Sequence, residues 1–317
     1  MIKELMMQTF FNVSYSRRLV GIKVLVFTGL LSSGVLTESF AACVNYSSRV
    51  TQAAQAYDFE TLQSLLPALR EAGCSEVYLD DVKRSMAQIA AARAKRLMKQ
   101  GRLKAAEGWL KRAPTMAWET QAVYGEIAAR RQQWQTASYF LNQSLDLIAD
   151  PQATPQAPQH WVIENLYQLA QELQILVGGL GTTVNDAGEG RGMMRAHVRG
   201  ITPRKRLLPI QFEFGGTQLS ETGQQSARKL AAYIKRKGVP KVTLIGHTDS
   251  KGKRQLNQRI SKQRAQSVKN YLQQSGVKAS IQALGKGEDD PLQLANAWQL
   301  TAAQIDRLNR RVEFMTD

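Results

Sequence analysis

Residues 241–274 read KVTLIGHTDSKGKRQLNQRISKQRAQSVKNYLQQ and contain three different patterns in succession. The apolar segment 241–245 predicts a strand, the polar segment 246–252 a loop, and the segment 257–274 a helix. The same alternation continues on both sides of this stretch. Further strands are expected at 210–214, 280–284 and 311–315, and a helix capped by Ser220 is expected at 221–237. Strands interleaved with helices indicate a C-terminal α/β sandwich.

One charged residue stands in the apolar row of the expected helix 257–274. Ile260, Val268 and Leu272 recur at multiples of four residues and define a core-facing row, and Arg264 falls within it. A guanidinium is almost never buried without a partner. Arg264 therefore requires either a structural carboxylate or a cleft in which a ligand carboxylate binds it at two points.

Two more polar residues are expected near Arg264. Asn257 lies two turns earlier on the same face of the helix, and Asp249 belongs to the loop that enters the helix from its N-terminal side. One carboxylate and one guanidinium in the same cleft form a receptor for a zwitterion, because the carboxylate takes an ammonium and the guanidinium takes a carboxylate. A structural salt bridge between Asp249 and Arg264 agrees equally well with these residues.

Four motifs of this region resemble the OmpA-like peptidoglycan-binding domain family. They are PIQFEFGGTQL, GHTDSKGKRQLNQRISKQRAQSV, GKGEDDP and LNRRVEF, and the resemblance covers residues 209–317. It implies that Asp249 and Arg264 hold the diaminopimelate of a cell-wall stem peptide. It also implies that Thr248, Asn257 and Arg310 complete the pocket. Ile260 replaces the leucine that is usual in the family, which leaves the packing intact.

The region from residue 43 to 150 shows a degenerate helical repeat. Amphipathic segments begin at Phe59, Leu103 and Trp134, each with a small or apolar residue three positions on and a leucine seven positions on. Preceding helices are expected at 50–57, 82–100 and 120–131. Ala106 and Ala137 fall 31 residues apart, near the roughly 34 of tetratricopeptide repeats, which these second helices resemble. The alternative is a plain helical bundle with an aromatic core and no ligand.

The segment 151–204 is expected to join the two domains. Three prolines within 151–158 favour an extended spacer, one helix is expected at 161–177, and glycines cluster at 178–181 and 188–192. The expected fold class is therefore α+β. An all-α domain of helical hairpins at 43–150 is joined by this linker to an OmpA-like α/β sandwich at 205–317.

The first 42 residues predict a secretory signal peptide. Arg17, Arg18 and Lys23 precede an apolar run at 24–36, and small residues follow at 39–42. The run is too short for a spanning helix, which needs about 20 apolar residues, so an uncleaved anchor is the weaker interpretation. Translation starting at Met6 or Met7 is also compatible with this pattern.

Two cysteines occur, Cys43 and Cys74. We favour a disulfide between them, because an oxidising compartment permits it and a closed loop of this length stabilises a fold by roughly 3–4 kcal/mol. The alternative is that Phe40, Ala41, Ala42 and Cys43 form a lipoprotein signal and that Cys43 carries lipid.

The charge indicates a polyanionic neighbourhood. The formal net charge is +16 and the mean hydropathy −0.32, which suit nucleic acid, an anionic lipid surface or the bacterial cell wall. The signal peptide argues against nucleic acid. His247 and Asp249 lack further ligands spaced for a metal, so we expect no metal site, no cofactor and no enzymatic activity. The acidic run 288–290 is expected to form a solvated turn, and Lys251, Lys253 and Arg254 either attract the wall or are ordinary loop charges.

The combined expectation is a non-enzymatic periplasmic tether of a Gram-negative bacterium. Its C-terminal domain binds peptidoglycan noncovalently, and its helical domain presents a surface to another envelope protein, with association to the outer membrane. The alternative is a structural docking component of an envelope, motor or secretion complex with little wall binding. The sequence does not identify the partner, the oligomeric state or the pathway.

Overall fold

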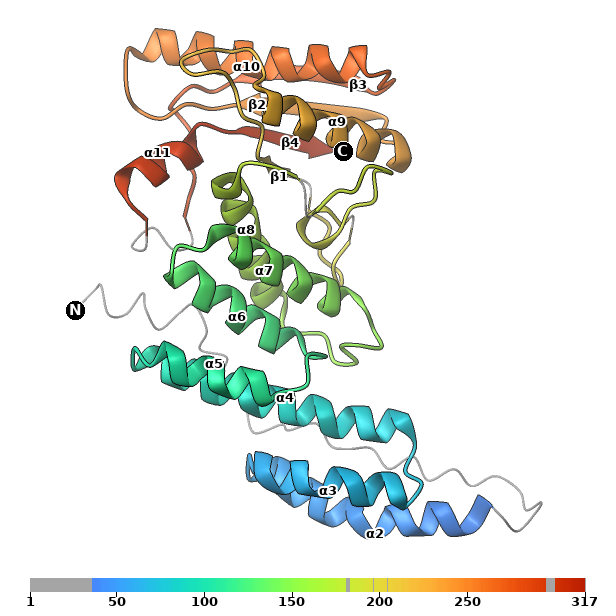
Figure 1. Cartoon of the computed structure of the whole chain (residues 1–317). Helices are drawn as coiled ribbons and strands as arrows, with labels where there is room; N and C mark the ends of the chain where they lie inside the picture. Colours follow the sequence, from blue (N-terminus) through green and yellow to red (C-terminus); the bar gives the residue numbers. More distant parts are fainter. Residues whose placement is uncertain (1–35, 181–182, 196, 204, 295–299, 317) are drawn as a thin grey trace. The chain divides into compact units, whose positions relative to one another are not determined.

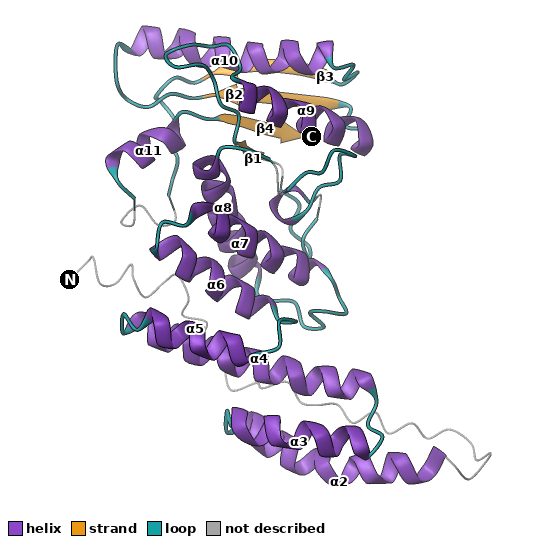
Figure 2. Cartoon of the chain, viewed as in Figure 1, coloured by secondary structure: helices purple, strands orange, loops and turns teal. Residues whose placement is uncertain are grey.

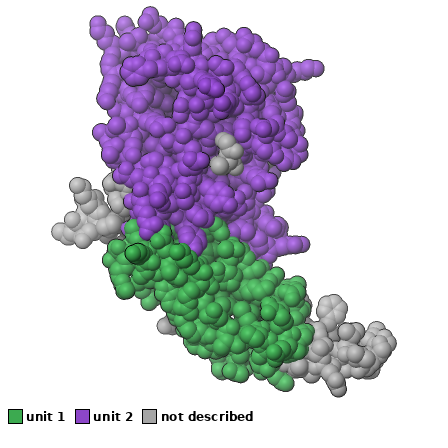
Figure 3. Space-filling model, viewed as in Figure 1, with its two compact units in different colours: residues 1–123 green, residues 124–317 purple. Residues whose placement is uncertain are grey.

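The computed structural model describes residues 36–180, 183–195, 197–203, 205–294 and 300–316. These described residues form two compact units, which divide between Val123 and Tyr124 (Figure 3). The predicted signal peptide lies outside the described residues up to position 35. Among the described residues, no helix combines the length and the apolarity that crossing a membrane requires.

The first unit is built from helices that run back and forth in pairs (Figure 2). They are α2 (Leu36–Gln55), α3 (Phe59–Glu71), α4 (Glu76–Lys99) and α5 (Leu103–Arg112), followed by the start of α6 (Trp118–Arg130). Two of the helix starts are fixed by local chemistry: the side chain of Asp58 caps α3 and that of Ser75 caps α4. The expected helical hairpins are thus present, whereas the likeness to tetratricopeptide repeats stays a prediction.

The core of the first unit lies between α2, α3 and α4. Phe59, Leu62 and Leu69 from α3 are fully buried and pack in one cluster with Leu79 and Val82 from α4. Such side chains supply most of the favourable free energy of folding, because their apolar surface leaves water. Each repeat segment therefore buries one helix face, as its residue spacing predicts.

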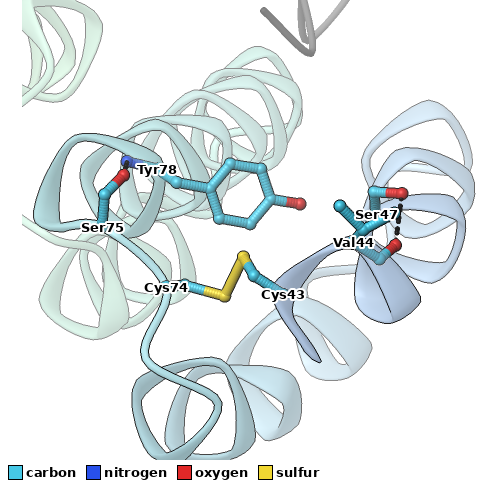
Figure 4. Close-up of a disulfide and its surroundings, with 6 residues drawn as sticks. All are labelled: Cys43, Val44, Ser47, Cys74, Ser75 and Tyr78. Carbon is cyan, nitrogen blue, oxygen red and sulfur yellow. Dashed lines mark hydrogen bonds between the residues drawn. A yellow bond between two sulfur atoms is a disulfide. The ribbon is translucent and has the colours of Figure 1, made fainter. Parts of the chain in front are cut away.

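A disulfide joins the two cysteines at the edge of this cluster. Cys43 on α2 is bonded to Cys74, which lies just before α4 (Figure 4). The disulfide favoured from the sequence is thus present. Because its sulfur is used in this bond, Cys43 has no thiol left for lipid attachment.

The second unit begins with two packed helices and the segment that was expected to be a linker. α7 (Trp134–Ala149) packs against α8 (His160–Val177), and the short 3-10 helix η1 (Gly192–Met194) packs against both. α8 also contacts strand β1 (Lys205–Leu208). The segment 151–204 therefore contributes packed elements to this unit, and the domain boundaries drawn from the sequence remain a prediction.

The rest of the second unit is a four-stranded mixed sheet with helices (Figure 1). The strand order is β1-β4-β2-β3, where β2 pairs with β3 in parallel and with β4 antiparallel, and β4 pairs with β1 antiparallel. α10 packs on β2 and β3 and also contacts α9. The remaining bounds are α9 (Glu221–Lys237), β2 (Lys241–Gly246), α10 (Arg254–Gln274), β3 (Ser280–Gly285), α11 (Ala302–Asn309) and β4 (Val312–Thr316).

One strand was predicted in the wrong place. Residues 210–214 form no strand, although Phe212 makes an isolated bridge to Leu219. The N–H of Gly216 donates to the Glu213 carbonyl at 2.9 Å, so the chain reverses in a turn and Phe214 is fully exposed. The edge strand is instead β1, a few residues earlier. α11 was not predicted; it is initiated by a capping box between Thr301 and Gln304.

Candidate functional site

The loop that carries Asp249 is held in place at the end of β2. The N–H of His247 donates to the Arg311 carbonyl at 2.9 Å, and the N–H of Thr248 donates to the Gly287 carbonyl at 2.8 Å. At Gly246 the strand approaches α10 so closely that a Cβ would lie 2.0 Å from the Ser261 carbonyl oxygen. Glycine is therefore required there, and this close approach brings the loop next to the N-terminal part of α10.

Asp249 is engaged by groups of its own chain. One carboxylate oxygen, Oδ1, accepts a hydrogen bond from the N–H of Lys251 at 3.1 Å. The other, Oδ2, accepts one from Nη1 of Arg310 at 2.5 Å. The Asp249 side chain is only 11% exposed, whereas that of Arg310, at the C-terminal cap of α11, is 40% exposed. The largely buried carboxylate of Asp249 is thus paired with an arginine that is itself partly exposed to solvent.

Arg264 is buried without a carboxylate partner. Its Nε donates to the Gly216 carbonyl at 3.2 Å, and its guanidinium lies over the Phe212 ring, 5.1 Å from the ring centroid. Within the described part of the chain, no carboxylate lies within 4.0 Å of it, and its two Nη nitrogens make no hydrogen bond. The structural salt bridge to Asp249, which the sequence left open, is therefore not formed.

The charges of Arg310 and Asp249 both act on the Arg264 guanidinium. Burial lowers the pKa of the Arg264 guanidinium, the positive charge of Arg310 lowers it further, and the negative charge of Asp249 raises it. Two guanidinium groups close together repel each other, and a bound carboxylate between them relieves that repulsion. The site therefore favours an anion beside Arg264 and Arg310.

Asn257 and Thr248 complete the neighbourhood of the loop. Nδ2 of Asn257 donates to the Lys251 carbonyl at 3.0 Å and to Oε2 of Glu288 at 2.5 Å, so this buried amide ties the loop to the turn after β3. Glu288 was expected in a solvated turn; it instead anchors Asn257. The hydroxyl of Thr248 is buried and has no hydrogen-bond partner among the described residues.

A buried ionic cluster lies beneath the loop, and its role was missed from the sequence. Oε1 of Glu313 accepts hydrogen bonds from Nη2 of Arg311 at 2.8 Å and from Nε of Arg311 at 3.1 Å. The same oxygen forms an ion pair with Nζ of Lys205 at 3.0 Å, and Nε2 of His247 lies 3.4 Å from Oε2 of Glu313. Burial alone would raise the pKa of Glu313, but His247, Arg311 and Lys205 together lower it to about 2. The cluster holds β4 against β2 at His247, the residue directly before Thr248. The sequence motif RRVEF contains both Arg311 and Glu313, but these two side chains become buried only when the sheet folds.

Other basic residues of the loop are paired. Lys251 Nζ lies 2.7 Å from Asp306 on α11, and Arg254 lies 3.0 Å from Asp289. These two residues are therefore engaged within the domain, which differs from their reading as free charges that attract the wall. In the part of the chain that the structure describes, no group of three histidine, cysteine or acidic residues is arranged to hold a metal ion.

Comparisons with known proteins support the resemblance seen in the motifs. Residues 211–304 match the family model described as "OmpA family". "Outer membrane protein A" of Shimwellia blattae is 38% identical over 112 residues, which are 33% of this chain and 46% of that protein. "Outer membrane porin F" of Pseudomonas aeruginosa is 33% identical over 108 residues, which are 33% of this chain and 29% of that protein.

A solved structure, that of "the peptidoglycan-associated lipoprotein from Burkholderia pseudomallei", has a TM-score of 0.30 and 23% identity over 36% of this chain and 91% of that one. The matched region thus spans less than half of the two curated relatives named above. The region matched by the family model, residues 211–304, contains α9, β2, α10 and β3 and includes Asp249, Asn257 and Arg264, whereas β1 and β4 lie outside it. The C-terminal part of this chain, from residue 211 to residue 304, is therefore an OmpA-like domain.

Proposed function

We propose that the C-terminal domain binds peptidoglycan noncovalently by holding the zwitterionic end of a stem-peptide diaminopimelate. The observation that carries this proposal is the Arg264 guanidinium. It is 9% exposed, it has no carboxylate partner among the described residues, and both of its Nη nitrogens are unbonded. The guanidinium is thus largely buried while its two Nη nitrogens still reach solvent, so a ligand carboxylate can bind them at two points.

The ligand's other charge is assigned to Asp249. The ammonium of diaminopimelate replaces Arg310 at Oδ2 of Asp249, and the displaced guanidinium then joins Arg264 at the ligand carboxylate. Because the cation is exchanged rather than added, Asp249 never becomes an unpaired, largely buried anion. Thr248 shapes the wall of the pocket, and Asn257 keeps the loop in register. The assignment to diaminopimelate rests on the family resemblance together with this pattern of charges.

For the whole chain we propose an envelope tether. The helical first unit presents a surface to another envelope protein while the C-terminal domain holds the wall. Relatives named as outer membrane proteins support an envelope location, which we take to be the periplasm. No chemical step is assigned to the site, because the proposed interactions are hydrogen bonds and ion pairs only. The domain boundaries at 43–150, 151–204 and 205–317 are part of this proposal.

Sedimentation with purified sacculi tests the site. Asp249→Asn and Arg264→Gln each remove one charge with little change in volume, and each is expected to lose most sacculus binding. Arg259→Gln is the matched control, because Arg259 is an exposed arginine on the same helix with no ion pair among the described residues. Unchanged sedimentation of both site variants, with thermal melts like the wild type, would reject the site and favour a docking role without wall binding. Release of muropeptides from the sacculi would contradict a purely noncovalent role.

A further inference from the structure

The closed end of the α4–α5 hairpin carries a group of exposed cations. α4 ends at Lys99 and α5 begins at Leu103, and the chain turns between them at Gly101, whose φ is 74°. The N–H of Arg102 donates to the Leu97 carbonyl at 2.9 Å, which keeps the turn tight. We call the exposed cations of this turn the basic tip; they are Arg96, Lys99, Arg102 and Lys104.

The basic tip has no anionic partner in its own unit. Within the described residues, none of its four side chains makes an ion pair or a hydrogen bond. Other cations of the same hairpin are engaged: Arg93 and Arg112 both pair with Glu60, and both stack on the Trp109 ring. Arg93 and Arg112 therefore stabilise the hairpin through these contacts, whereas the residues of the basic tip make no such contacts.

Two residues of the basic tip, Arg102 and Lys104, also oppose the local stability of α5, whereas Arg96 and Lys99 lie favourably in the last turn of α4. The cap residue Arg102 makes no side-chain hydrogen bond, and the first turn of α5 contains Lys104 and no acidic residue. Because a helix N-terminus carries partial positive charge, cations there are unfavourable. The neighbouring helices α3 and α4 instead begin with the capping residues Asp58 and Ser75. The charges of Arg102 and Lys104 are thus offset neither by the helix nor by a partner among the described residues, and an anionic partner outside the unit would offset them.

The shape and composition of the basic tip favour a lipid surface over a protein partner. The end of a hairpin is convex, and between residues 96 and 104, all of which the structure describes, no large apolar side chain is exposed. Protein interfaces usually contain buried apolar or aromatic anchors, which this surface does not offer. A layer of phosphate headgroups binds clustered lysine and arginine by charge alone. We propose that the basic tip binds the phosphate headgroups of an anionic lipid surface.

The proposal is tested by sedimentation with vesicles. The purified full chain is mixed with phosphatidylcholine vesicles with and without phosphatidylglycerol. The test variant replaces Arg96, Lys99, Arg102 and Lys104 with glutamine. The control replaces Arg228, Arg259, Lys262 and Lys278 with glutamine. It also removes two arginines and two lysines, but from exposed positions of the second unit.

Wild type and control are expected to bind the phosphatidylglycerol vesicles, and the test variant is expected to bind them roughly 1000-fold more weakly. All three proteins carry the same N-terminal segment, so its own affinity for lipid cancels. Equal losses in the test variant and the control would overturn the proposal, because net charge would then explain the binding. Binding of the basic tip to soluble polyglutamate but not to vesicles would also overturn it and would indicate an acidic protein surface. Because the assay contains no peptidoglycan, its result is independent of the wall site.

Discussion

Replacing Arg310 with glutamine separates the two roles that the structure gives this residue. Arg310 holds Asp249 in the unliganded site through a contact of 2.5 Å, and in the proposed complex it contacts the ligand carboxylate. Since the Arg310 side chain is 40% exposed, the ion pair contributes about 1 kcal/mol or less. Without Arg310, a ligand that brings only an ammonium should bind up to about 5-fold more tightly.

A ligand that brings both charges should respond in the opposite direction. It also gains from losing the competitor, but it loses a charge-assisted hydrogen bond worth about 1.5–3 kcal/mol, or about 10- to 150-fold in affinity. The net expectation for Arg310→Gln is weaker binding of a diaminopimelate stem peptide. For the same peptide amidated at the free diaminopimelate carboxylate, binding should be unchanged or tighter.

Isothermal titration of the two peptides measures this difference directly. The control is Arg259→Gln, which removes an exposed arginine of α10 that makes no ion pair among the described residues. It should leave the preference between the two peptides unchanged. If Arg310→Gln weakens both peptides by the same factor, Arg310 only positions the loop. If it strengthens both, Arg310 only competes with the ammonium. Either result refutes the proposed exchange.

Three further predictions concern stability. Glu313 has a folded pKa of about 2, below its usual 4.5, so its stabilising effect of about 3 kcal/mol is complete above pH 4.5 and is lost as the pH falls towards 2. Glu313→Gln should therefore speed hydrogen exchange in β2 and β4 near neutral pH and flatten its acid dependence; equal acid dependence in the two proteins would contradict the cluster's role. Cys74→Ala should destabilise the first unit by roughly 3 kcal/mol, measured by urea unfolding that is monitored through amide hydrogen exchange in α3 and α4. A reductant should have no further effect on this variant. Gly246→Ala should cost about 1–3 kcal/mol, because its Cβ meets the Ser261 carbonyl, and an unchanged melting temperature would show that α10 can shift away.

Local sequence was sufficient for most of the helices and for the peculiarity of Arg264. α9 begins after Ser220 and ends before Gly238, as its capping residues indicate, and α3, α5 and α7 begin at the residues where the repeat pattern starts. The apolar row on α10 correctly predicted that Arg264 is buried. These features depend on residues within a few turns of one another, and periodicity records such local preferences directly.

Only the tertiary structure decided which residues meet. The alternation at 210–214 looks like a strand, but the pairing partner β4 is taken by β1, and a turn at Gly216 directs Phe212 towards Arg264. Arg310 lies 61 residues from Asp249, and Glu313 is contacted by Lys205 of β1, by His247 just after β2 and by Arg311 just before β4. Such contacts depend on how distant segments are brought together in the sheet, which leaves no periodic signal in the chain. The sequence by itself determined most of the helices and the buried arginine, and the fold determined that Arg310, and not Arg264, holds Asp249.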